Sequence, residues 1–241
     1  EPFAQIGVKL DAARDTVEAR NTIPRAAYDP TLLYRPEYDP NDSAFTREDA
    51  VRVTREWLEE FRRNGGIEEL RQFPGIPYAA RPSQDGPAIG FMFTELGKSR
   101  AIARMNAARM YLAAQAGDDA ERLAAFEESL AIGRILSAQV SLIDHLVGIA
   151  IHALVQSEVR VHIVEGKVTG AAAANLLTAL DRQRLNDLAA TLDTERLFML
   201  DTIQRTFSDT GKGNGRFMPT AAAAMGTEFG LVPGGHRMGE Y

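Results

Sequence analysis

The sequence predicts an all-α protein built from antiparallel helical hairpins. From residue 94 to residue 207, apolar residues recur every three or four positions, which is the spacing of one helix face. Two of the helices predicted there end at glycines, Gly117 and Gly166, and the short connections bring the next helix back antiparallel. Hydrophobic residues make up 45% and charged residues 25% of the 241 positions, a balance that allows a sizeable buried core.

Residues 1–45 are predicted to hold a short helix followed by an irregular, proline-rich arm. Phe3, Ile6 and Leu10 begin a helical stripe that reaches about residue 20. Between residues 23 and 40, proline recurs too densely for a continuous helix. Three tyrosines stand among these prolines: Tyr28, Tyr34 and Tyr38. We expect the tyrosines to hold the arm in place, either on the helical body or against a partner.

Residues 46–93 are predicted to form one capped helix and a long irregular connection. Thr46 and Asp49 make a capping box at the start of the helix, and Gly65 with Gly66 ends it. The stretch 73–87 is rich in proline and glycine, so we place the boundary between two subdomains there.

Residues 94–207 are predicted to form a body of five helices. A capping box at Asp118 and Glu121 starts the second of these helices. The third helix, 139–165, is apolar almost all round, which places it at the centre of the body. The fourth helix is expected from about Gly170 through Leu188, and the fifth from about Asp193. The glycine-rich tail, residues 208–241, is predicted to lie as loop.

Two resemblances bear on this body. The segment 113–130 resembles part of a tetratricopeptide repeat, because Gly117 takes the inter-helix position and Phe126 and Leu130 fit the second helix. No second copy follows at 34 residues, which indicates a TPR-like hairpin and not a repeat array. The stretches AAQAGDDAERLAAF, LSAQVSLIDHLVGIAIHALV and TLDTERLFMLDTIQ resemble uncharacterised alanine- and arginine-rich helical proteins of planctomycete-type bacteria. That resemblance implies a helical body behind an export or anchor segment, hence an extracytoplasmic location, and it implies no activity.

Composition and charge exclude some classes of protein. A formal net charge of −6 argues against a phosphate-binding surface, so we expect no nucleic-acid partner. The absence of cysteine excludes disulfides and thiolate chemistry. The most apolar run, 146–155, is shorter than the roughly 20 residues that a transmembrane helix needs. Because the sequence begins with Glu1, we expect any signal peptide or membrane anchor to lie outside it.

The histidines and the glycine-rich turn do not predict a metal site. His145 and His152 are two helical turns apart, about 10.5 Å along the axis, which is too far for both to bind one metal ion. We expect them to be buried, hydrogen-bonded structural residues. The segment 209–215 begins like a calcium loop, but glycines stand at its third and fifth positions, where oxygen ligands are needed. We therefore predict no metal ligand.

The carboxylates likewise predict no acid–base pair. Glu127 and Glu128 are adjacent in sequence and point to different sides of their helix, which is typical of a solvated face. Asp201 and Arg205 have the i, i+4 spacing of a surface ion pair. No catalytic residue and no cofactor-binding residue follows from these patterns, nor does a Walker A loop, a G-x-S-x-G elbow or a dinucleotide fingerprint occur.

We interpret the chain as a non-enzymatic helical scaffold or accessory protein that binds a protein partner or forms a homo-oligomer. The alternative is an enzyme or small-molecule binder with a pocket between helices, for which the candidate residues are Arg100, Arg104, Asp144 and His145. A third reading is a subunit of a membrane-associated assembly.

Overall fold

The computed structural model describes residues 2–34, 45–76, 96–139, 141–208 and 215–219, and within these ranges the chain is helical. Outside the helices, one isolated bridge joins Phe207 to Phe217. The all-α prediction is confirmed. The helices are α1 (Pro2–Arg20), α2 (Arg47–Arg63), α3 (Gly66–Leu70), α4 (Leu96–Ala116), α5 (Asp119–Ser137), α6 (Leu142–Val164), α7 (Gly170–Arg182) and α8 (Leu188–Thr206), with 3₁₀ turns η1 (Arg25–Tyr28), η2 (Pro30–Leu33) and η4 (Phe73–Gly75).

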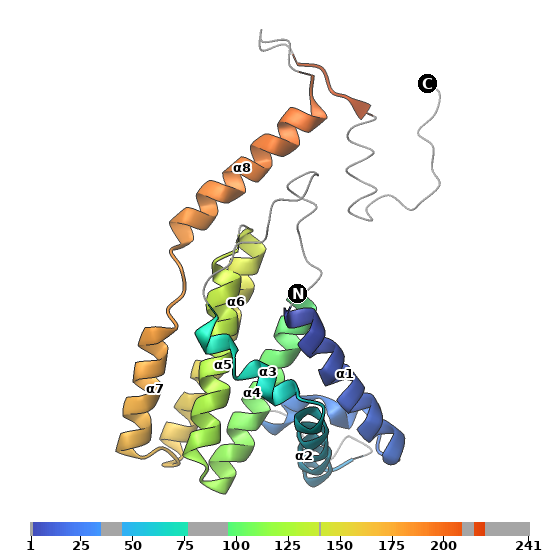
Figure 1. Cartoon of the computed structure of the whole chain (residues 1–241), viewed down its shortest axis with the longest axis vertical. Coiled ribbons are helices and arrows are strands. Elements are labelled where there is room, and N and C mark those ends of the chain that lie inside the picture. The colour runs from blue at the N-terminus through green and yellow to red at the C-terminus, as the bar shows by residue number, and fades with distance from the viewer. Residues whose placement is uncertain (1, 35–44, 77–95, 140, 209–214, 220–241) are drawn as a thin grey trace.

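In the body, the α4–α5 hairpin packs against α6, and α7 packs on α5 (Figure 1). Gly117 and Gly166 follow α4 and α6 with φ of 70°, a left-handed conformation that glycine adopts without strain. The central helix is α5, which packs against α4, α6 and α7. The prediction that the 139–165 helix is central was wrong, because α6 leaves Ile143, Leu146 and Ile149 exposed on one side.

Helices α5 and α6 approach each other closely where two glycines face one another. A Cβ atom added to Gly148 would lie 2.5 Å from the carbonyl oxygen of Gly133, and one added to Gly133 would lie 2.3 Å from the ring of His152. Neither position has room for a side chain. Because Gly133 and Gly148 have no side chains, α5 and α6 can approach each other closely at this point.

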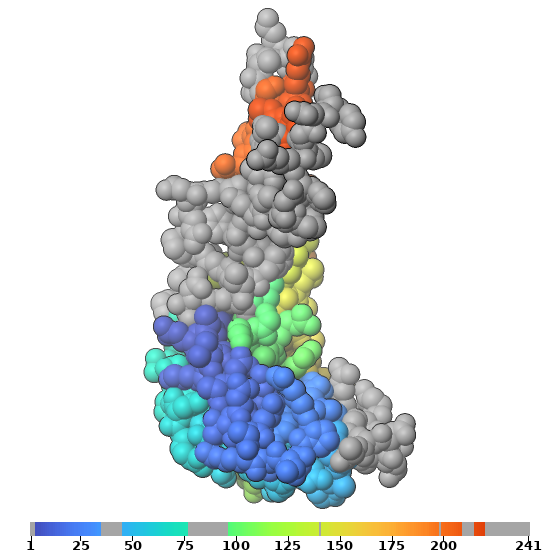
Figure 2. Space-filling model, turned by 90° about the vertical axis from the view of Figure 1, so that its right-hand side faces the viewer, coloured from blue at the N-terminus to red at the C-terminus, as the bar shows by residue number. Residues whose placement is uncertain are grey.

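The N-terminal helices pack on the body through one continuous core. Trp57 of α2 donates its indole N–H to the carbonyl of Leu10 in α1 at 2.9 Å, and the rings of Phe3 and Phe73 stack with centroids 5.2 Å apart. One cluster of buried side chains runs from α1 and α2 into α4, α5 and α6, and so joins residues on both sides of the 73–87 segment. Figure 2 shows α1 and the arm beside α4 on one face of the molecule.

The arm is more regular than predicted over its first half. Residues 25–33 form two 3₁₀ turns, because Asp29 accepts a hydrogen bond from the backbone of Thr31 at 2.9 Å and Pro30 favours the first position of a turn. Tyr28 and Leu33 are buried in the core and Tyr34 is half-buried, so this half of the arm packs on its own chain. Tyr38 lies outside the described residues.

Helix boundaries differ from the prediction at three places. Helix α7 ends at Arg182 and not near Leu188. Helix α8 begins at Leu188 and not near Asp193, because the side chain of Asp187 accepts the backbone N–H of Ala189 at 3.0 Å and caps the helix there. Five residues, Gly66–Leu70, form the unpredicted helix α3, which follows Gly65 with φ of 80°. The calcium-like segment 209–215 and the tail after residue 219 lie outside the described residues, apart from Gly215.

Among the described residues, α6 is the helix whose length and composition would allow it to cross a membrane. It spans 23 residues, longer than the apolar run at its centre. It also carries buried ionisable side chains, Asp144, Glu158 and His162, on the side packed within the protein. The other side exposes Ile143, Leu146 and Ile149, so α6 packs within the protein along one side.

Candidate functional site

The first candidate site is a groove between the arm, α4 and α6, with a volume of about 260 Å³. Arg100 and Arg104 lie one turn apart on α4 and are both exposed. Neither has a hydrogen-bond or ion-pair partner within the described part of the chain. The side chains that line the groove with them are Thr31, Tyr34, Ala103, Ala150, Ile151 and Leu154. The groove thus combines two free positive charges with an apolar floor.

The other two predicted pocket residues lie elsewhere. Asp144 and His145 are buried in the first turn of α6 and do not line this groove. His145 Nδ1 lies 3.0 Å from the carbonyl oxygen of Ser137 and 3.0 Å from the hydroxyl of Thr191 in α8. The structure therefore brings the two arginines together and the two α6 residues together, but it does not join the two pairs.

His152 is also a structural residue, as the sequence predicted for both histidines. Its Nε2 lies 2.8 Å from the carbonyl oxygen of Leu130 in α5. Burial lowers the pKa of His152, so the neutral ring donates this hydrogen bond at neutral pH. No group of three His, Asp or Glu residues within the described ranges is placed to hold a metal ion.

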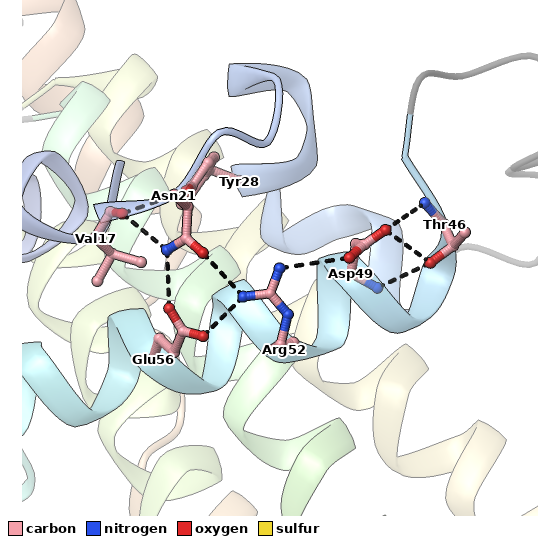
Figure 3. Close-up of polar contacts among 7 residues, drawn as sticks. All are labelled: Val17, Asn21, Tyr28, Thr46, Asp49, Arg52 and Glu56. Atoms are coloured by element: carbon pink, nitrogen blue, oxygen red, sulfur yellow. Dashed lines mark hydrogen bonds and ion pairs between the residues drawn. The ribbon is translucent and has the colours of Figure 1, made fainter. Parts of the chain in front are cut away.

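A second groove, of about 460 Å³, runs along α2 toward Tyr111 of α4. Two of its charged residues, Arg52 and Glu56, bind each other, as Figure 3 shows. Arg52 donates to Asn21 and to Glu56, both at 2.9 Å, and Asn21 in turn donates to the carbonyl of Val17 and to Glu56. The hydrogen bond from Asn21, together with Arg52, lowers the pKa of Glu56. These groups tie the end of α1 to α2, so Arg52 and Glu56 have a structural role.

The strongest polar cluster is buried between α4 and α5. Arg109, only 2% exposed, donates to Glu121 at 2.9 Å, to Asn106 at 2.8 Å and to Glu128. Glu128 is 1% exposed. Burial raises the pKa of Glu128, although the guanidinium of Arg109 opposes this shift. The prediction of a solvated face was wrong for Glu128, because the facing helix supplies a buried cation. Its neighbour Glu127 does pair near the surface, with Arg182 at 3.2 Å.

Glu121 extends this cluster to the N-terminal helices. Besides Arg109, it accepts hydrogen bonds from Arg62 of α2 at 3.3 Å and from Arg71 at 3.2 Å. Partial burial acts to raise the pKa of Glu121, but the three arginines outweigh it and the pKa is lowered. A single carboxylate thus links three segments of the fold. Because three arginines neutralise the negative charge of Glu121, its role is to hold these helices together.

A large exposed apolar surface lies on α8, which leads away from the bundle in Figure 1. The start of α8 is held in place: Glu195 accepts the backbone N–H of Leu142 at 2.9 Å, and Thr191 contacts His145. Asp201 and Arg205 form the predicted ion pair at 2.9 Å. Seven large apolar side chains of this segment are 39% to 64% exposed: Leu188, Leu192, Leu197, Met199, Leu200, Ile203 and Phe207.

Sequence reasoning found the apolar stripe of α8 but not its exposure, because periodicity shows which residues share a face and not what covers that face. It did not find the Arg109 cluster. A usable signal existed, since Arg109 stands next to Met110 in a stripe of small apolar residues, where a charge requires a partner.

No family model, no curated protein and no solved structure matches this chain.

Proposed function

We propose that the chain is a non-enzymatic helical scaffold that binds protein through the exposed apolar surface of α8. The observation that carries this proposal is the set of six large exposed apolar side chains on one projecting helix. Exposed apolar patches of this kind mark interaction sites, because covering them removes apolar surface from water. The pairing of Arg52 with Glu56 and of the charges in the Arg109 cluster further supports a structural role for these groups over a catalytic one.

The α4–α5 hairpin belongs to the same proposal. We propose that it is TPR-like, on the basis of Gly117 at the turn and of Phe126 and Leu130 on the second helix. Both side chains are buried, as the repeat would require. Hairpins of this class serve as rigid supports for binding surfaces.

Site-specific photo-crosslinking in the native host tests the proposed function. A photo-crosslinking amino acid would replace Met199 on α8 in one variant and Val8 on α1 in another. Val8 is the matched control, because it is a large apolar residue, 64% exposed, and no other large apolar residue of α1 is exposed. We expect covalent protein adducts from position 199 and none from position 8. Absence of adducts at position 199 would refute the proposal.

A second candidate function, ligand binding, is favoured by the groove that holds Arg100 and Arg104. Two guanidinium groups that have no partner among the described residues, beside an apolar floor, suit a carboxylate that carries an apolar chain. Decanoate is a suitable probe. It should raise the melting temperature of the protein, and the double variant Arg100→Gln/Arg104→Gln should lose this rise. Arg55→Gln, at another exposed arginine without a partner among the described residues, should keep it; an equal rise in all three proteins would contradict a site here.

A further inference from the structure

We propose that the exposed side of α6, together with Arg100 and Arg104 of α4, binds the surface of a membrane that contains anionic phospholipid. This inference goes beyond the proposed function, because it uses a different surface from α8 and a different kind of partner. The exposed side of α6, here called the α6 face, carries six large apolar residues: Ile143, Leu146, Ile149, Val161, Ile163 and Val164.

The α6 face runs along the whole helix. Eleven of the 23 residues of α6 are exposed, and at about 100° per residue they fall within an arc of about 160°. The opposite side packs within the protein and holds the ionisable residues Asp144, Glu158 and His162. Helix α6, about 35 Å long, can therefore lie flat on a surface while its ionisable side stays in the bundle.

The charge on the α6 face has one sign. Helix α6 contains two carboxylates, Asp144 and Glu158, and both are buried. Arg160 is therefore the one charged residue that α6 exposes along residues 142–164. The exposed part of α8 differs, because it carries the paired charges Asp201 and Arg205. The α6 face thus has positive charge and no negative charge to balance it.

Two more arginines border the α6 face. Arg100 and Arg104 of α4 line one groove with Ala150 and Leu154 of α6. Within the described ranges, neither these two arginines nor Arg160 has a hydrogen-bond or ion-pair partner. The chain as a whole has a net charge of −6, so this positive charge is local and would orient the protein on an anionic surface. Guanidinium groups bind phosphate through two parallel hydrogen bonds, which suits the headgroups of phospholipids.

The side chains of the α6 face favour lipid over a protein partner. Its large apolar residues are all aliphatic, and α6 contains no phenylalanine, tyrosine, tryptophan or methionine. Aromatic residues and methionine are enriched in protein interfaces, and α8, the proposed protein-binding helix, does carry Met199. When a helix lies in a membrane interface, its aliphatic side enters the boundary between headgroups and acyl chains, and its arginines reach the phosphates.

Flotation of the full chain with lipid vesicles tests the inference. We expect binding to vesicles made of phosphatidylglycerol and phosphatidylcholine in equal parts. Binding to phosphatidylcholine alone should be at least about tenfold weaker, because each arginine near an anionic surface accounts for about fivefold in affinity. Added salt should weaken the binding, because it screens the arginines. No binding to the anionic vesicles, or equal binding to both kinds, would overturn the inference.

Variants assign the binding to the α6 face. Leu146→Glu should weaken it by about tenfold or more, because a negative charge replaces an apolar contact. Arg100→Gln/Arg104→Gln should weaken it by about 25-fold. The matched controls are Leu177→Glu on α7, where the leucine is 64% exposed, and Arg55→Gln on α2, and both should bind like the unaltered chain. Circular dichroism checks that each variant keeps its helices. Binding that survives both α6-face variants would contradict the proposal.

A fluorescent label shows directly which helix meets the lipid, and the chain has no cysteine of its own to interfere. Ala153→Cys places an environment-sensitive dye on the α6 face, and Ala174→Cys places it on α7, at another exposed alanine. On anionic vesicles the dye at position 153 should brighten and shift to the blue, and the dye at position 174 should not change. The same response at both positions would count against a specific face.

The α8 surface is tested separately. Leu200→Glu, on α8, should leave vesicle binding unchanged, and a loss of binding in this variant would move the membrane contact to α8 and overturn the inference. A photo-crosslinking amino acid at Ile149 that gives protein adducts, in a chain that does not bind vesicles, would show a protein partner instead. Absence of adducts at position 199 would refute the proposed function and leave the α6 face unaffected.

Discussion

Removing the charge of Glu128 should cost the protein more stability than removing the buried pair altogether. Glu128→Gln keeps the shape of the side chain but leaves Arg109, 2% exposed, with Glu121 as its remaining carboxylate. Breaking a buried ion pair costs about 3–5 kcal/mol. Because Glu121 still lies 2.9 Å from the guanidinium, we expect about 3 kcal/mol, at the low end of that range.

The double variant Arg109→Met/Glu128→Met removes both charges and fills the space with apolar atoms. It leaves Asn106 without the donor it has now, which costs about 1 kcal/mol, so we expect a loss of about 1–2 kcal/mol. Urea unfolding followed by circular dichroism measures both values. Glu127→Gln is the control, because its partner Arg182 is exposed, and should change the free energy of unfolding by less than about 1 kcal/mol. A loss below about 1 kcal/mol for Glu128→Gln, or a double variant less stable than the single one, would refute the reasoning.

Three further predictions concern the packing of the helices. Gly148→Ala should destabilise the protein by about 2–4 kcal/mol, because the new Cβ would lie 2.5 Å from the carbonyl oxygen of Gly133, and thermal melts would measure the loss. Thr46→Ala should cost about 1 kcal/mol in urea unfolding, because the hydroxyl caps α2; an unchanged midpoint would argue against the cap. Burial lowers the pKa of His152 below that of the unfolded chain, so its contribution to stability is present above about pH 6.5 and is lost as pH falls below that value. The variant His152→Gln should show a smaller loss between pH 7 and pH 5, and an identical pH profile would contradict this assignment.

Local signals in the sequence predicted most of the helices because these signals act within one element. The hydroxyl of Thr46 and the carboxylate of Asp49 cap α2 as expected, and Gly117 ends α4 in a left-handed conformation. Where two signals competed, the prediction failed. Leu188 continued the stripe of the preceding helix, but the cap at Asp187 decided where α8 begins.

The candidate site was only partly predictable, because its parts depend on how the helices face one another. Arg100 and Arg104 share a groove since they are one turn apart on α4, a relation that the sequence contains. His145 points into the junction of α5, α6 and α8, which no spacing within α6 could indicate. The burial of Glu128 likewise follows from Arg109 on the facing helix.

The continuous core has a consequence for synthesis of the protein on the ribosome. The apolar residues of α1 and α2 are made first, yet they share their core with residues as late as Ile151 on α6. Ile151 stands 78 positions after Phe73, and at about 5–20 residues per second the synthesis of this stretch takes about 4–16 seconds. During that interval, the residues of α4, α5 and α6 that help to bury Phe3, Trp57 and Phe73 have not all been synthesised. The N-terminal third of the chain is therefore the part that we expect to depend on chaperones while the rest is being made.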